Sequence, residues 1–145
     1  MSFGSFLQWV RRSKMMQLTY LTFYYTTGTD INASVNYALT EQEGRYTAVI
    51  CPRGVSAEHA IVTEVGENFV TEVTSVLLQY HVGRWNGFDR SRKNVLDGNS
   101  FTLNAGFTSG KSIHAHGYMW WPKHFRAVRD ALDACFMRLY LPSSQ

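Results

Sequence analysis

The sequence is poor in the residues that mark disordered or strongly charged chains. Only three of its 145 residues are proline, charged residues make up 17%, and the formal net charge is just +3. Together with the lack of any low-complexity run, these values exclude a disordered tail. Hydrophobic residues account for 45% of the chain and aromatic residues for 14%. A chain of this length and composition is expected to form one domain with a substantial core.

Cysteine is scarce too, with only Cys51 and Cys135 present. No Cys-x-x-Cys or Cys/His metal spacing occurs, which argues against a redox role for either cysteine. Both cysteines are expected to act as small buried hydrophobic residues.

Motifs for nucleotide binding and nucleophilic catalysis are missing as well. The chain has no Walker loop, no Gly-x-Gly-x-x-Gly and no nucleophile elbow. We therefore predict no cofactor and assign no catalytic residue, and we favour a protein that is not an enzyme.

The first residues, "MSFGSFLQWVRRSKMMQ", have neither the charge order nor the cleavage site of a signal peptide. Their apolar stretch is too short to span a membrane. We expect a leader over residues 1–14, with a short amphipathic helix as the alternative, one domain over 15–141 and a tail over 142–145. A cytoplasmic location without a membrane partner is expected.

Several segments rich in β-branched and aromatic residues predict strands. "QLTYLTFYYTT", over residues 17–27, is apolar on both faces, which is typical of a central strand. "ASVNYALT" and "RYTAVICP" alternate on either side of "EQEGR" and predict a hairpin. Residues 60–65 are a further short candidate. "SFTLNAGF" and "SIHAHGY" predict a second hairpin around "TSGK".

The hydrophobic period changes to that of a helix in two other segments. From Glu67 to Tyr80, apolar side chains recur at helical spacing. A second apolar stripe follows Pro122, a residue type favoured at the first helical position. The order β-β-β-(β)-α-β-β-α predicts an α+β fold, in which an antiparallel sheet of about five strands carries both helices on one face.

An aromatic-glycine corner follows the first predicted helix. The dipeptide Asn86-Gly87 favours a turn with positive φ, and Asp97-Gly98 is a second turn signal before the next strand. The predicted structural anchors of the intervening loop are Trp85, Gly87, Phe88, Asp97 and Gly98.

The same loop contains "DRSRKN", which brings three cationic residues close together: Arg90, Arg92 and Lys93. One interpretation is that these side chains are simply solvated. The alternative is that they contact phosphate groups or an acidic protein surface.

The motifs "WNGF", "VLDG", "SFTLNAGFTSGKSIHAHG" and "WPKHF" together resemble a group of small bacterial domains of unknown function. The typical pattern of that group is Trp-Asp-Gly-Phe, Leu-Asp-Gly, a hairpin with a turn glycine, and Gly and Pro before a final helix. The resemblance covers about Tyr80 to Phe136. This chain departs from the pattern at Asn86, where the group usually has aspartate. The resemblance supports the fold and implies no reaction.

The link "GYMWWPKHF" carries more aromatic surface than a short connection can bury. Exposed Trp, Tyr and Arg side chains are enriched at protein interfaces. The alternative is that both tryptophans cover the sheet and the helix start. The predicted binding residues are Trp120, Trp121, Tyr118, Arg90, Arg92 and Lys93.

His114 and His116 alternate along a predicted strand, so their rings point to the same face. With His81 or His124 they could form a three-nitrogen metal site. Because spacing fixes neither a third ligand nor a nearby carboxylate, we predict no metal site and keep the pair only as candidate ligands.

Three functional hypotheses follow from these features. The first is a binding or inhibitor module that acts on a protein partner or self-associates, encoded by a mobile element. The second is nucleic-acid binding through the basic loop and exposed tryptophans, with affinity that falls steeply with salt. The third is a hydrolase with a histidine metal site.

Overall fold

The computed structural model describes residues 16–26, 34–94 and 98–140. The predicted leader and tail lie outside the described residues, as does Asp97. The strands are β1 (Leu18–Thr26), β2 (Val35–Gln42), β3 (Arg45–Cys51), β4 (Ile61–Val65), β5 (Asp89–Ser91), β6 (Ser100–Phe107) and β7 (Ser112–Tyr118). The helices are α2 (Glu67–Gln79) and α3 (Phe125–Tyr140), with short 3-10 turns η2 (Ala57–His59) and η3 (Val82–Trp85).

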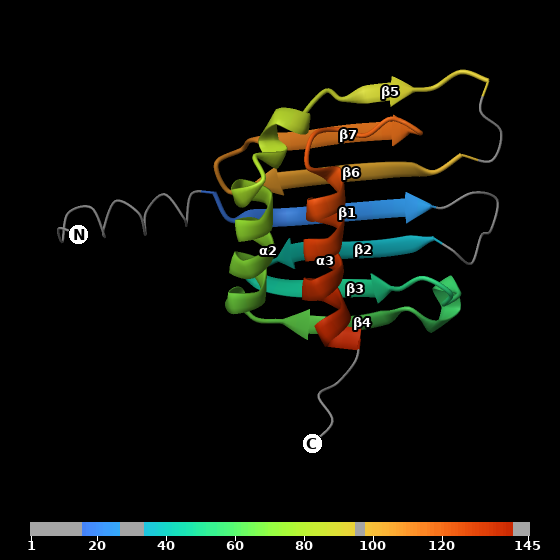
Figure 1. Ribbon diagram of the computed structural model, residues 1–145. Helices are drawn as coiled ribbons and strands as arrows, with labels where there is room; N and C mark the ends of the chain where they lie inside the picture. The colour runs from blue at the N-terminus through green and yellow to red at the C-terminus, as the bar shows by residue number, and fades with distance from the viewer. Residues whose placement is uncertain (1–15, 27–33, 95–97, 141–145) are drawn as a thin grey trace.

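The strands form one sheet in the order β4-β3-β2-β1-β6-β7-β5 (Figure 1). Neighbouring strands are antiparallel, except that β5 runs parallel to β7. Strand β1 lies in the centre, between β2 and β6, as its apolar character on both faces predicts. The first hairpin, β2–β3, and the second, β6–β7, therefore flank it on opposite sides.

The α+β class is confirmed, but the prediction of about five strands is wrong. The described residues contain seven, and the predicted order leaves out β5, which follows α2 and η3. The missing strand lies in the predicted basic loop. Its three residues are all exposed and show no hydrophobic period. Pairing with β7 alone makes this segment a strand, and no local pattern announces that pairing.

The last helix also begins later than predicted, at Phe125 rather than Pro122. The N–H of Phe125 donates to the carbonyl of Pro122 at 3.2 Å, so a turn precedes the helix. Proline fixes the start of this turn instead of the first helical position.

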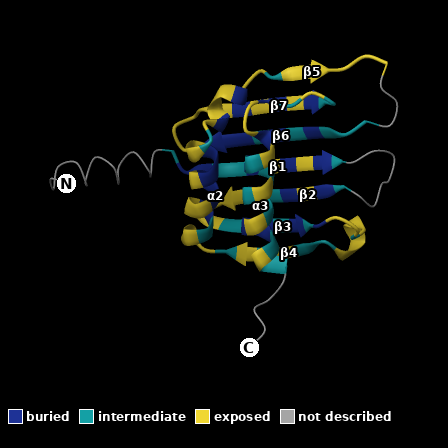
Figure 2. Cartoon of the chain, in the orientation of Figure 1, coloured by how far each residue is buried: buried dark blue, intermediate teal, exposed yellow. Residues whose placement is uncertain are grey.

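Both helices pack on one face of the sheet, as Figure 1 shows. The ring of Phe136 from α3 stacks on Tyr37 from β2 with centroids 4.7 Å apart, and it meets Phe69 from α2 edge-on at 5.2 Å. Alternate residues of the central strands are buried under the helices, as the dark blue centre of Figure 2 shows. The core is thus a layer between one sheet face and two helices.

The two cysteines differ in burial. Cys135 is 4% exposed on α3, which confirms its prediction, whereas Cys51 is only half-buried and its Sγ donates to the carbonyl of Val55 at 3.3 Å. The expectation of burial is therefore wrong for Cys51. In the described part of the chain, no helix has the length and apolar character that crossing a membrane requires.

Candidate functional site

Trp120 and two arginines of the basic segment meet at one edge of the sheet. The guanidinium carbons of Arg90 and Arg92 each lie 5.3 Å from the centroid of the Trp120 ring. The tryptophan nevertheless stays 40% exposed. We call Arg90, Arg92 and Trp120 the Trp120 patch. It combines two cation–π contacts with a large exposed aromatic surface.

Strand β5 positions the two arginines. Its parallel register places Arg90 beside Gly117 of β7, and the N–H of Arg92 donates to the carbonyl of Tyr118 at 3.0 Å. Residues two apart in a strand point to the same face, so both arginine side chains project together. The Nε of Arg92 donates to the carbonyl of Met119 at 2.9 Å, which fixes this guanidinium group beside the indole.

The link after β7 turns Trp120 back over the edge of the sheet. Met119 has a left-handed conformation with φ of 55°, and its N–H donates to the carbonyl of Asn99 at 2.8 Å. The carbonyl oxygen of Trp120 lies over Gly117, where a Cβ atom would meet it at 2.2 Å. The glycine therefore allows the close approach that brings Trp120 to the arginines.

The second tryptophan, Trp121, belongs to the aromatic core. Its ring centroid lies 4.7 Å from that of Phe125 and 5.8 Å from that of Phe101. The ring is only partly buried, but it offers less free surface than Trp120. Of the two tryptophans predicted to bind, only Trp120 is exposed, at 40%.

The two other predicted binding residues lie close to the patch in sequence. Tyr118 is half-buried, and its hydroxyl accepts a hydrogen bond from the N–H of Gly98 at 2.9 Å. Lys93 is exposed in the turn that follows β5. Tyr118 thus supports Gly98 just before β6, and Lys93 adds an exposed positive charge next to Arg92 in the sequence.

The aromatic-glycine corner joins the end of η3 to β7. Trp85 is 3% exposed, and its Nε1 donates to the carbonyl of Lys123 at 3.1 Å. Gly87 has φ of 86°, and its N–H donates to the carbonyl of His114 at 2.9 Å. The side-chain oxygen of Asn86 accepts from the N–H of His114 at 3.0 Å. An aspartate at position 86 would accept the same hydrogen bond.

The aromatic ring of Phe88 completes the corner. It is half-buried with its centroid 6.2 Å from that of Phe101, and the Phe88 carbonyl accepts from the N–H of His116 at 2.8 Å. Hydrogen bonds made by Gly87 and Phe88 therefore fix the corner to β7, just before β5 begins.

His114 and His116 lie exposed on the sheet face opposite the helices. The Nδ1 of His114 is 2.8 Å from the side-chain oxygen of Asn104, and the Nδ1 of His116 is 3.1 Å from the hydroxyl of Thr102. Among residues 16–26, 34–94 and 98–140, no three His, Cys, Asp or Glu side chains are grouped to hold a metal ion. On β6 the neighbours of the pair are neutral polar groups, and on β5 the single carboxylate of Asp89 pairs in register with His116.

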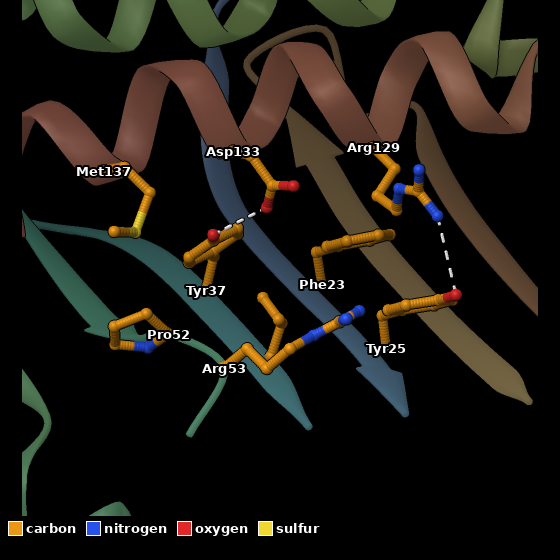
Figure 3. A pocket seen from close by; sticks show the side chains of 9 residues that line it. Phe23, Tyr25, Tyr37, Pro52, Arg53, Arg129, Asp133 and Met137 are labelled. Atoms are coloured by element: carbon orange, nitrogen blue, oxygen red, sulfur yellow. Dashed lines mark hydrogen bonds between the residues drawn. The ribbon is translucent and has the colours of Figure 1, made fainter. Parts of the chain in front are cut away.

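A second feature, a pocket of about 580 Å³ beside α3, escaped the sequence-based prediction (Figure 3). Two contacts made by charged side chains, a hydrogen bond and a cation–π contact, shape its α3 wall. The Tyr37 hydroxyl donates to Oδ1 of Asp133 at 2.6 Å, and Arg129 lies over the Tyr25 ring with its guanidinium carbon 5.5 Å from the centroid. Its lining residues are Phe23, Tyr25, Val35, Tyr37, Pro52, Arg53, Arg129, Asp133 and Met137.

Burial raises the pKa of Tyr37 far above its usual value, and the neighbouring Asp133 carboxylate raises it further. The ring is 1% exposed, so an ionised phenolate there would be poorly solvated and would face a negative charge. The pKa of Arg129 is also raised: burial alone would lower it, but hydrogen bonds to Asp130 and to the Tyr25 hydroxyl outweigh burial.

Tyr37→Phe is expected to lower the free energy of unfolding by about 1.5–3 kcal/mol near neutral pH, since it removes a hydrogen bond to a charged group. This contribution should be complete below pH 10 and decline above it, because the unfolded tyrosine then ionises while folded Tyr37 keeps its proton. The decline is about 1.4 kcal/mol per pH unit. Urea denaturation of both proteins on either side of pH 10 measures it. Parallel stability curves for the two proteins would contradict the assignment.

The pocket escaped prediction because it depends on tertiary contacts. The pocket draws on β1, β2, the residues after β3 and one side of α3. The sequence contained one hint of the pocket. Arg129 and Asp133 are four residues apart on α3, so these two charged residues share one helix face beside the apolar stripe.

Neither a scan against protein-family models nor a search of curated proteins gives a match for this chain.

Proposed function

We propose that this protein is a small binding module that acts on a protein partner through the Trp120 patch. The observation that carries the proposal is an indole that stays 40% exposed while two guanidinium groups contact its ring. Tryptophan and arginine dominate the energetic centres of protein interfaces. An inhibitory effect on the partner and a cytoplasmic location belong to the same proposal.

The patch is ordered by the backbone, which favours tight binding. Arg92 is held through both its N–H and its Nε, and Trp120 follows a turn fixed by the Met119–Asn99 hydrogen bond. A partner would therefore immobilise few additional rotamers on this side of the interface. Strand β5 also forms an edge of the sheet and carries three exposed residues.

The charge of the patch indicates the chemistry of the partner. Arg84, Arg90, Arg92 and Lys93 are all exposed near this edge. We propose a partner segment that carries carboxylates around an apolar or aromatic pocket for the indole. Complementary charges of this kind accelerate association and select the partner.

Nucleic acid is the less favoured partner. A base that stacks on Trp120 would have to compete with the guanidinium groups of Arg90 and Arg92, which already contact its ring. The rings of Phe101 and Phe125 occupy much of the surface of Trp121.

The test is affinity capture from a bacterial lysate, run with and without nuclease, with tagged wild type and Trp120→Ala compared by mass spectrometry. Val62→Ala is the matched control, because Val62 is 66% exposed on β4, at the opposite edge of the sheet. We expect one dominant partner that wild type and Val62→Ala retain and that Trp120→Ala loses. An untagged second copy of this chain, added to the lysate, reports self-association in the same experiment.

Two results would contradict the proposal. One is a dominant partner that Trp120→Ala captures as well as wild type does. The other is a broad set of proteins that disappears with nuclease, which would move the function to nucleic-acid binding.

A further inference from the structure

We propose that the pocket beside α3 binds a small organic anion with a flat apolar body, such as an aromatic carboxylate. The pocket lies over the ends of β1 and β2 and is separate from the Trp120 patch. Its volume of about 580 Å³ is in the range of small-molecule sites. Its walls combine aromatic and aliphatic side chains with a few polar groups, which is typical of such sites.

One end of the pocket is cationic. Figure 3 shows Arg53, from the segment after β3, extending toward Tyr25, with Arg129 approaching from α3. Arg53 is exposed and forms no ion pair with an acidic side chain in the described ranges of the chain. Arg129 is fixed by Asp130 at 3.1 Å and by the Tyr25 hydroxyl at 3.5 Å. One anchored and one adaptable guanidinium group provide several donors for a carboxylate.

The floor of the pocket is aromatic and rigid. Phe23 and Tyr25 are 0% and 5% exposed, and both project from β1, the central strand of the sheet. Their rings both approach the ring of Phe125, at 6.2 Å and 5.9 Å between centroids, which holds them in place from the core side. The apolar body of a ligand would rest on the small exposed part of this floor, which belongs to Tyr25.

The other end of the pocket is acidic, and this polarity orients the ligand. Oδ1 of Asp133 accepts the hydrogen bond of the buried Tyr37 hydroxyl. The carboxylate disfavours a second anion near Tyr37 and Met137, so the anionic group of the ligand points toward Arg53. A hydrogen-bond donor on the far side of the ligand would suit Asp133.

The test is a titration of isotope-labelled protein with indole-3-acetate, followed by amide chemical shifts. Indole-3-acetamide is the matched neutral ligand, with the same ring and nearly the same size. We expect saturable shifts in β1, β2 and α3 with the acid and at least about tenfold weaker binding of the amide, or about 1.4 kcal/mol.

Arg53→Glu should weaken the binding of indole-3-acetate at least about tenfold, as much as the change from acid to amide does. Arg45→Glu is the control. Arg45 is an exposed arginine at the opposite end of β3, so this substitution changes the charge by the same amount away from the pocket. Both positions are exposed, so neither variant disturbs the core.

A free aromatic acid and the C-terminal residue of a peptide present the same carboxylate and ring. Acetyl-Gly-Gly-Phe and its C-terminal amide form a second arm of the titration that separates these sources. The site is supported if either acid binds more tightly than its amide and if Arg53→Glu abolishes that difference. Equal binding of acid and amide, shifts outside the pocket, or no saturable shift with any of the four probes would overturn it.

Discussion

Phe101→Ala is expected to lower the free energy of unfolding by about 3–5 kcal/mol. Phe101 is 0% exposed on β6. Its ring centroid lies 4.7 Å from that of Phe125 and 5.8 Å from that of Trp121. On the other side it meets Trp85 at 6.0 Å and Phe88 at 6.2 Å. Removal of this ring leaves a cavity bordered by four aromatic groups that cannot all close it.

Denaturation in urea or guanidinium chloride measures this loss directly. Leu78→Ala is the control, because Leu78 is 43% exposed on α2 and should change stability by about 0.5 kcal/mol or less. A loss of less than about 1 kcal/mol for Phe101→Ala would contradict the packing described here.

Gly117→Ala is expected to cost about 3 kcal/mol and to displace the Trp120 patch. A Cβ atom at this position would lie 2.2 Å from the carbonyl oxygen of Trp120 and 2.6 Å from Cε1 of Phe101. The first contact is with backbone, so the link after β7 must move, and such overpacking is destabilising. Because Gly117 pairs with Arg90 in β5, the movement should also separate Trp120 from the arginines.

The Trp120 indole N–H signal and the amide signals of β5 report this displacement in nuclear magnetic resonance spectra. Gly83→Ala is the matched control, since a Cβ atom at Gly83 would meet nothing within 4 Å. A Gly117→Ala protein with wild-type stability and unchanged Trp120 signals would show that the close approach is not required.

The sequence carries enough local information for most of the fold. The apolar faces of "QLTYLTFYYTT" predict a central strand, and β1 is central. The alternating segments on either side of "EQEGR" and "TSGK" predict the hairpins β2–β3 and β6–β7. In each case, side-chain period and turn chemistry act within a short stretch.

The remaining features depend on contacts between distant segments. Strand β5 is polar and exposed, and only its register with β7 makes it a strand. That register also brings Arg90 and Arg92 to Trp120, about thirty positions later in the chain. The pocket likewise requires Tyr37 and Asp133, separated by 96 positions, to meet under α3. Composition and spacing alone do not specify such pairs.

Affinity for the captured partner tests the central role of the Trp120 patch most directly. Isothermal titration of that partner with wild type, Trp120→Ala and Val62→Ala should give equal affinities for wild type and Val62→Ala. Trp120→Ala is expected to bind at least roughly 30-fold more weakly, or about 2 kcal/mol, as for an interface hot spot. Equal affinities for all three proteins would contradict the account and place the binding surface elsewhere on the domain.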